Sequence, residues 1–297
     1  MRALSALCIG GKSNNSNEED ILSIKLTLLD AGYCIQSEHW VLRGGRRKPI
    51  RFPATFALLE HSEFGPILFD TGYAPRFFEA TRRFPYSLYA KATPVYLDEH
   101  ETALRKLQAR GIAPTDIQYV LISHFHADHI AGIADFPRAR YIYLQAAFEA
   151  VQHRRGLRAV LAGFLPGLMP AGFQERSQPL DPGQMQRLPS AYTPFTDGLD
   201  LLGDQSIWAV PLPGHAEGHM GLFLQANGQE CYFLAVDACW HSRAYREYIL
   251  PHPLTRLICS DWAAYRETLA KVHHFHRRRP EVHIILSHCP EVYERYI

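Results

Sequence analysis

The sequence predicts an α/β protein in which two β-sheets lie between outer layers of helices. Apolar runs typical of buried strands occur in both halves of the 297-residue chain, and helical patterns follow them. No low-complexity stretch that could serve as a linker separates the two halves. We therefore expect a single domain over residues 1–297, long enough to bury an extensive core.

The first half of the chain supplies strands and two helices. The expected strands are 21–29, 53–59, 66–69, 119–122 and 141–144. The third of them ends in the turn signal Asp70-Thr71-Gly72. A helix is expected at 98–110, because Leu104 and Leu107 share one face and Gly111 stands where a C-terminal cap belongs. A second helix should begin at Gln145.

The second half supplies the rest of the two sheets. The expected strands are 207–212, 221–225, 231–236 and 282–286, with a helix at 262–276. Residues 156–196 form an insertion that begins with the most apolar segment, 156–173. Pro166 and Pro170 interrupt this segment, and it is too short to span a bilayer. We expect a pair of short core helices there. The alternatives are a lid over an apolar substrate and a contact in a homodimer.

Composition and charge exclude several classes of protein. The chain is 47% hydrophobic and 21% charged, which is typical of a globular protein. A net charge of +1 offers no attraction to nucleic acid or to acidic membranes, so we expect neither as a partner. The basic run 273–279 falls at the end of the expected helix 262–276, where cations favour the helix dipole and face solvent.

The cysteine pattern favours a reducing compartment. The six cysteines stand at positions 8, 34, 231, 239, 259 and 289, with no Cys-x-x-Cys pair and no spacing typical of a disulfide framework. The beginning of the chain resembles a signal peptide only faintly, because it has one basic residue, a short apolar run and no cleavage site. We therefore expect a cytoplasmic protein.

A dense group of potential metal ligands follows the expected strand 119–122. Three histidines and an aspartate fall within six residues: His124, His126, Asp128 and His129. Imidazole and carboxylate are the usual ligands of zinc and similar divalent ions. His124 and His126 can point the same way from a strand end, and the other two can curl back toward a second ion. A polar turn with incidental histidines is the weaker interpretation, because four such groups are costly to pack unless they bind something.

Three further candidates each stand just past an expected strand. His215 follows Pro213-Gly214, Asp237 ends the run 232–236, and His288 follows Ser287. Alone, each is more often a helix cap or a satisfied polar residue. Together they indicate one site, because strand ends at one edge of a sheet converge on a common crevice.

These residues carry a specific family resemblance. The order His-x-His-x-Asp-His, Pro-Gly-His, strand-terminal Asp and strand-terminal His resembles the ligand order of the metallo-β-lactamase superfamily, and Asp70-Thr71-Gly72 resembles its early Asp-Thr-Gly. The intervals fit as well: 86 residues from His129 to His215, 22 to Asp237 and 51 to His288. Over 52–297 the chain is most similar to the quorum-quenching N-acyl homoserine lactone lactonases.

The resemblance implies an αββα sandwich and a site for two divalent ions. By the resemblance, His124, His126 and His215 would hold one ion; Asp128, His129 and His288 would hold the other, with Asp237 bridging both. Zinc suits these ligands, and manganese, cobalt or iron could replace it. The implied reaction is attack of a metal-bridging hydroxide on a lactone ester, with Asp128 and Asp237 as catalytic carboxylates and Asp237 as the proton shuttle. Asp70 would orient a ligand imidazole.

Departures from the lactonase pattern leave the substrate open. Lactonases usually have a tyrosine three residues after the bridging aspartate, whereas this chain has Trp240, which we take as a catalytic candidate able to donate one N–H. Cys289 follows the last histidine where aspartate is commoner, and the interval from His129 to His215 is longer than in compact lactonases. The alternatives are a thioesterase of glyoxalase II type, another ester hydrolase, or a signal-binding protein without turnover.

Overall fold

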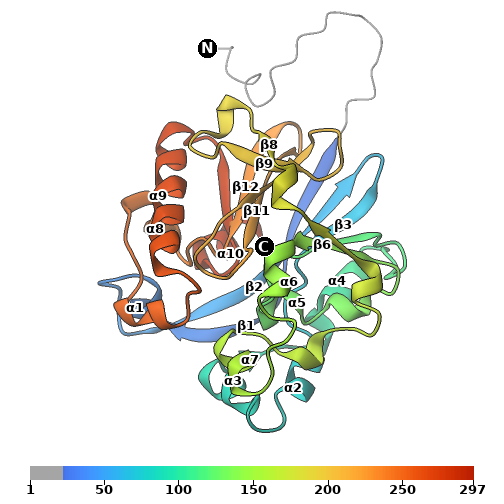
Figure 1. Ribbon diagram of the computed structural model, residues 1–297, viewed down its shortest axis with the longest axis vertical. Helices are drawn as coiled ribbons and strands as arrows, with labels where there is room; N and C mark the ends of the chain where they lie inside the picture. Colours follow the sequence, from blue (N-terminus) through green and yellow to red (C-terminus); the bar gives the residue numbers. More distant parts are fainter. Residues whose placement is uncertain (1–22) are drawn as a thin grey trace, which may run out of the picture.

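Two β-sheets pack face to face, and helices cover the outer face of each (Figure 1). This computed structural model describes residues 23–297. Helices α8 (Ser242–Glu247) and α9 (Trp262–Arg278) lie against one sheet, and α4 (Ala103–Gln108), α5 (Ala127–Ile130) and α6 (Gln145–Glu149) lie beside the other. The predicted four-layer αββα arrangement is confirmed.

The first sheet has seven strands in the order β4-β1-β2-β3-β5-β6-β7. Their bounds are Ile24–Ser37 (β1), Pro49–His61 (β2), Gly65–Phe69 (β3), Val95–Tyr96 (β4), Tyr119–Leu121 (β5), Arg140–Leu144 (β6) and Ser177–Leu180 (β7). Strands β3, β5, β6 and β7 run parallel. Their carboxyl ends therefore meet at one edge, where the metal-ligand candidates begin.

The second sheet has six strands in the order β13-β12-β11-β10-β9-β8. Their bounds are Gln186–Arg187 (β8), Asp197–Asp200 (β9), Ile207–Pro211 (β10), Met220–Ala226 (β11), Glu230–Val236 (β12) and His283–Leu286 (β13). Only the pair β12 and β13 is parallel among the described strands of this sheet. These two strands end side by side, just before Asp237 and His288.

Alternate residues of the central strands enter two different cores. In β3, Ile67 and Phe69 join the core between the sheets, whereas Leu68 joins the core under the outer helices of the first sheet. In β5, Leu121 joins the core between the sheets, and Val120 joins the core under the outer helices. Each fully buried aliphatic or aromatic side chain contributes about 1.5–3 kcal/mol. Burial on both faces explains why these strands read as continuous apolar runs in the sequence.

The structure corrects two expected elements of the first half. Strand β1 does not end at residue 29 but continues to Ser37 through a bulge, where Gly32 adopts a φ of +75°. The expected residues 21 and 22 of this strand lie outside the described part of the chain. The expected helix 98–110 is divided at Thr102, whose side chain caps α4 after the short 3₁₀ turn Glu99–Glu101.

The apolar segment 156–173 forms two short helical turns, α7 (Leu157–Leu161) and the 3₁₀ turn Pro166–Leu168. Phe164 and Leu168 are buried, as expected of core helices, whereas Leu157 and Leu161 are 51% and 76% exposed. None of the helices in residues 23–297 has the length and apolar character needed to cross a bilayer.

Several short elements gave no clear signal in the sequence. They are α1 (Glu38–Val41), α2 (Arg76–Ala80), α3 (Ser87–Ala92), α8, α10 (Pro290–Tyr296) and the strands β4, β7, β8 and β9. Most are too short to display a period, so contacts with the two sheets decide their conformation.

Candidate metal centre

The first four candidate ligands lie on the loop that leaves β5 and on the short helix α5. His124 lies on the loop, His126 is the N-cap of α5, and Asp128 and His129 lie within the helix. A helical turn after an extended segment changes the direction of the side chains. The loop therefore presents two histidines on one side of the centre and an aspartate–histidine pair on the other.

Asp70 holds this loop from the end of β3. One of its carboxylate oxygens, Oδ1, accepts a hydrogen bond from the Ser123 backbone N–H at 2.8 Å. The other, Oδ2, lies 2.7 Å from both Ser123 Oγ and His129 Nδ1. Ser123 Oγ in turn lies 2.9 Å from His124 Nδ1. These contacts place a proton on Nδ1 of His124 and His129, so Nε2 of each ring is the nitrogen directed into the centre and available to a cation.

His215 enters the centre from the loop after β10, on the second sheet. The preceding Gly214 has a φ of +121°, and a Cβ atom there would lie 2.1 Å from the backbone nitrogen of Tyr265 in α9. Only glycine lets this loop pass so close to the helix, which places His215 opposite the β5 loop.

The variant Gly214→Ala is expected to lower the free energy of unfolding by about 2–4 kcal/mol, because the new methyl group overlaps backbone atoms that cannot retreat. Gly228→Ala is the control, since Gly228 also has a positive φ, +86°, but nothing lies within 4 Å of its Cβ position. Denaturant unfolding of both variants measures the difference. Equal losses would show that the close approach to α9 is not what constrains the loop.

Asp237 and His288 follow the parallel pair β12 and β13. Val236 has a φ of +51°, which turns the chain sharply at the end of β12. His288 Nδ1 donates to the backbone carbonyl of Pro53 at 2.7 Å, and its ring stacks on Phe52 at a centroid distance of 5.2 Å. This contact fixes the imidazole so that Nε2 faces the centre.

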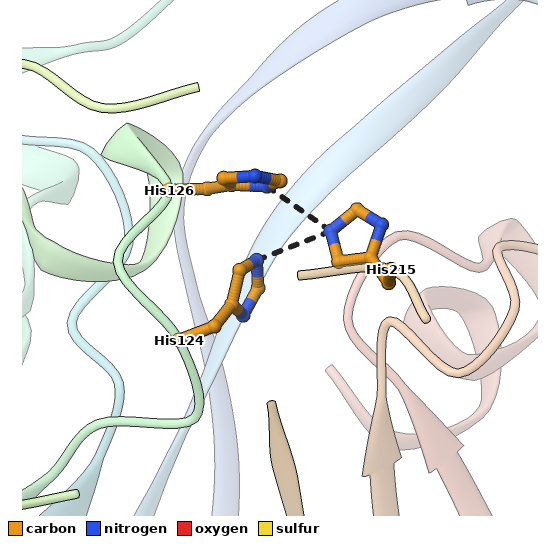
Figure 2. A group of neighbouring side chains, drawn as sticks. All are labelled: His124, His126 and His215. Atoms are coloured by element: carbon orange, nitrogen blue, oxygen red, sulfur yellow. Dashed lines mark hydrogen bonds between the residues drawn. The ribbon is translucent and has the colours of Figure 1, made fainter. Parts of the chain in front are cut away.

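Three histidines from the two sheets point toward one another, as Figure 2 shows. His215 Nε2 lies 3.2 Å from His124 Nε2 and 3.0 Å from His126 Nδ1. Four-coordinate zinc with bonds of about 2.0–2.1 Å holds its ligand nitrogens about 3.3 Å apart. The spacing of the three nitrogens therefore suits a shared cation.

A second group lies on the other side of Asp237. Asp128, His129 and His288 each offer a ligand atom, all within 4.8 Å of one another. Asp237 Oδ2 lies 3.2 Å from both His215 Nε2 and His288 Nε2, so its carboxylate contacts both groups. All seven residues that the sequence predicts as ligands are thus brought together.

Two of the buried polar atoms that have no hydrogen-bond partner among the described residues face each other at the centre. They are His129 Nε2 and Asp237 Oδ1, which lie 3.7 Å apart. Leaving such atoms unpaired costs about 1–3 kcal/mol each. A cation bound between them would satisfy both, so the residues present fit a divalent metal ion.

The electrostatics of the centre suit imidazole ligands around a cation. Burial lowers the pKa of His126 to about 3, and the neighbouring His215 adds to this effect, so the ring is neutral and able to act as a ligand. Burial works in the same direction at His129, but the carboxylates of Asp70, Asp128 and Asp237 outweigh it and raise the pKa to about 9. Three carboxylates around one imidazole favour a cation there.

Trp240 lies beside the centre and contacts two of its residues. Its indole N–H donates to Asp237 Oδ2 at 3.1 Å, and the ring meets His215 edge-on at 5.5 Å. The predicted candidate is therefore in the site, but its single donor is directed at the carboxylate. Ser123 was missed in the sequence, although its place immediately before the histidine cluster was the available signal.

Comparisons with known proteins agree with this geometry. Residues 51–228, more than half of the chain, match the family model described as "Metallo-beta-lactamase superfamily". A probable metallo-hydrolase of Mycobacterium tuberculosis is 27% identical over 80% of this chain and 75% of its own length. An N-acyl homoserine lactonase, AttM, of Azorhizobium caulinodans is 27% identical over 77% of this chain and 81% of its own.

Solved structures show the same fold. A structure of an N-acyl homoserine lactone hydrolase with the product N-hexanoyl-L-homoserine bound at its catalytic metal centre aligns with a TM-score of 0.68 at 20% identity, over 93% of this chain and all of that one. The dizinc quorum-quenching lactonase AidC aligns with a TM-score of 0.60 at 17% identity, over 92% of both chains. By the family match and the fold, the chain belongs to the metallo-beta-lactamase superfamily and is a metal-dependent hydrolase.

Proposed function

We propose that the protein is a dinuclear hydrolase that opens lactone esters, with N-acyl homoserine lactones as the substrate class. The observation that carries the proposal is the pair of ligand groups joined by Asp237, whose carboxylate contacts a histidine of each group at 3.2 Å. Curated relatives named as lactonases support the substrate class. Zinc is the proposed ion, because imidazole and carboxylate groups make up the donor set.

In the proposed assignment, His124, His126 and His215 hold one ion, and Asp128, His129 and His288 hold the other. Asp237 would contribute its carboxylate to both groups. Divalent ions bound there would supply Lewis acidity toward the ester carbonyl and lower the pKa of water.

The protein's own residues orient the reaction. Asp70 fixes the proton of His129 on Nδ1, and the carbonyl of Pro53 does the same for His288. Asp237 Oδ2 is held by the Trp240 N–H, while Oδ1 makes no hydrogen bond with any described residue. Asp237 is the residue we assign to carry a proton to the leaving oxygen. The burial of Asp237 excludes bulk water and strengthens these interactions.

A substrate panel tests the proposal. Proton release is measured with metal-quantified protein against short- and long-chain acyl homoserine lactones, a simple γ-lactone and a glutathione thioester. Turnover confined to the lactones supports the proposal. Turnover of the thioester alone would replace it with a hydrolase of glyoxalase II type, and no turnover of any ester by fully loaded protein would reject both.

The variant Trp240→Phe is expected to lower kcat by about 10- to 100-fold, because it removes a hydrogen bond to a charged carboxylate, worth about 1.5–3 kcal/mol, and keeps an aromatic ring. Trp40→Phe is the control, since Trp40 packs against His39 and His252, neither of which is a candidate ligand. Steady-state kinetics of the two variants are compared. A higher KM with an unchanged kcat would indicate that Trp240 binds substrate and does not position Asp237.

A further inference from the structure

One residue of the insertion touches the candidate metal centre directly. Gly163, which follows α7, has a φ of +65°, and a Cβ atom built on it would lie 2.4 Å from Cδ2 and 2.8 Å from Nε2 of His126. Gly163 is thus in van der Waals contact with the edge of the imidazole that faces away from His215. No side chain larger than hydrogen fits between the two without moving one of them.

The same glycine also holds the backbone of the ligand loop. Its carbonyl accepts a hydrogen bond from the N–H of Ala127 at 3.1 Å. Ala127 is the first residue of α5, and N–H groups in the first turn of a helix have no partner within the helix. Gly163 therefore fixes His126 both through its ring and through the peptide that follows it.

His126 differs in this respect from three of the other histidines. The outer ring nitrogens of His124, His129 and His288 are hydrogen-bonded to Ser123, Asp70 and Pro53. Among the described residues, the hydrogen bond recorded for His126 runs through Nδ1 to His215, on the inner side. Ligand imidazoles are ordinarily oriented by a hydrogen bond to the outer nitrogen. At His126, the contact with Gly163 replaces this orienting hydrogen bond.

We propose that Gly163 is a positioning residue for His126, so that the turn 156–163 of the insertion is a structural part of the metal centre. The inference rests on the proposed metal centre and does not depend on the lactone substrate. It assigns to this segment a task different from closing over a substrate or joining two subunits.

The turn is anchored well enough to act as a support. At its start, the Gly156 N–H donates to the hydroxyl of Tyr86 at 3.1 Å. In its middle, Ala159 is fully buried, and the Phe164 N–H returns to the Ala159 carbonyl at 3.0 Å. Both ends of the turn are anchored at the core under the outer helices of the first sheet. The backbone at Gly163 therefore cannot move easily to relieve a clash between a new side chain and His126.

The test compares alanine at two glycines of the insertion. Gly163→Ala and Gly172→Ala carry nearly the same backbone strain, because the φ angles are +65° and +68°. They differ in surroundings, since the nearest atom at Gly172 is the terminal Oε2 of Glu175 at 3.6 Å. Metal affinity is measured by competition with a chelator, and Tm by thermal unfolding.

Gly163→Ala is expected to weaken binding of the first ion by about 10- to 100-fold, the range seen when a residue that orients a metal ligand is removed. Gly172→Ala should keep its metal affinity within about twofold of wild type and lose only the Tm that the strained φ costs. The absorption spectrum of cobalt-loaded protein should shift for the first variant only, because the spectrum reports ligand geometry. Gly163→Asn provides a second variant, as asparagine tolerates a positive φ but keeps the clash.

The outcomes separate this inference from the one on which it rests. Wild-type protein that binds no divalent ion would overturn both. Wild-type protein that binds metal, with unchanged affinity and cobalt spectrum in Gly163→Ala and Gly163→Asn, would overturn the role of Gly163 alone.

Discussion

Replacing Asp237 with asparagine should lower kcat/KM by at least about a thousandfold and reduce the bound metal below that of wild type. The carboxylate is buried and contacts a histidine of each ligand group. Asparagine keeps the shape but removes the charge and one acceptor oxygen. Loss of several kcal/mol of transition-state stabilisation corresponds to such a factor, at about 1.4 kcal/mol per tenfold.

Asp135→Asn is the matched control for this variant. Asp135 is a half-buried aspartate that pairs with Arg76 at 2.9 Å and is not one of the seven ligands. Metal content by elemental analysis and lactone turnover are measured on both proteins. Near-normal activity of Asp237→Asn with wild-type metal content would remove Asp237 from the mechanism and leave two separate ion sites.

The ligands could be predicted from the sequence because each group of them follows the end of a strand. His288 and Asp237 follow apolar runs that are buried on both faces, and such runs are recognisable without knowledge of their neighbours. Strands that end at one edge bring their next residues together, so the convergence of distant residues follows from topology.

What supports the ligands could not be predicted, because it depends on contacts between segments far apart in the chain. The contact of Gly163 with His126 and the hydrogen bond from His288 to the Pro53 carbonyl leave no pattern in the sequence. The same is true of the bulge at Gly32, where Asp30-Ala31-Gly32 reads as a strand end. Trp240 was recognised by its position, yet the direction of its N–H is set by packing against Tyr265 and His215.

Removing the metal ions should abolish hydrolysis and lower Tm by at least about 10 °C. An ion that binds the folded state stabilises it by about 4 kcal/mol when present at a thousand times its Kd, and 1 kcal/mol shifts Tm by about 2–4 °C in a protein of this size class. Removal also leaves the half-buried carboxylate of Asp128 and the buried carboxylate of Asp237 sharing His288 Nε2, which lies 3.2 Å from an oxygen of each.

Chelation followed by controlled reloading measures this effect and identifies the ion. Zinc, cobalt, manganese and ferrous iron should each restore Tm, whereas magnesium and calcium should not, because these prefer oxygen ligands and the groups offer mainly imidazole nitrogen. The ion that gives the highest kcat at its ordinary cellular availability is then assigned as native. Unchanged Tm and activity in protein shown by elemental analysis to be metal-free would mean that the converging histidines serve packing, and the assignment of the whole centre would fail.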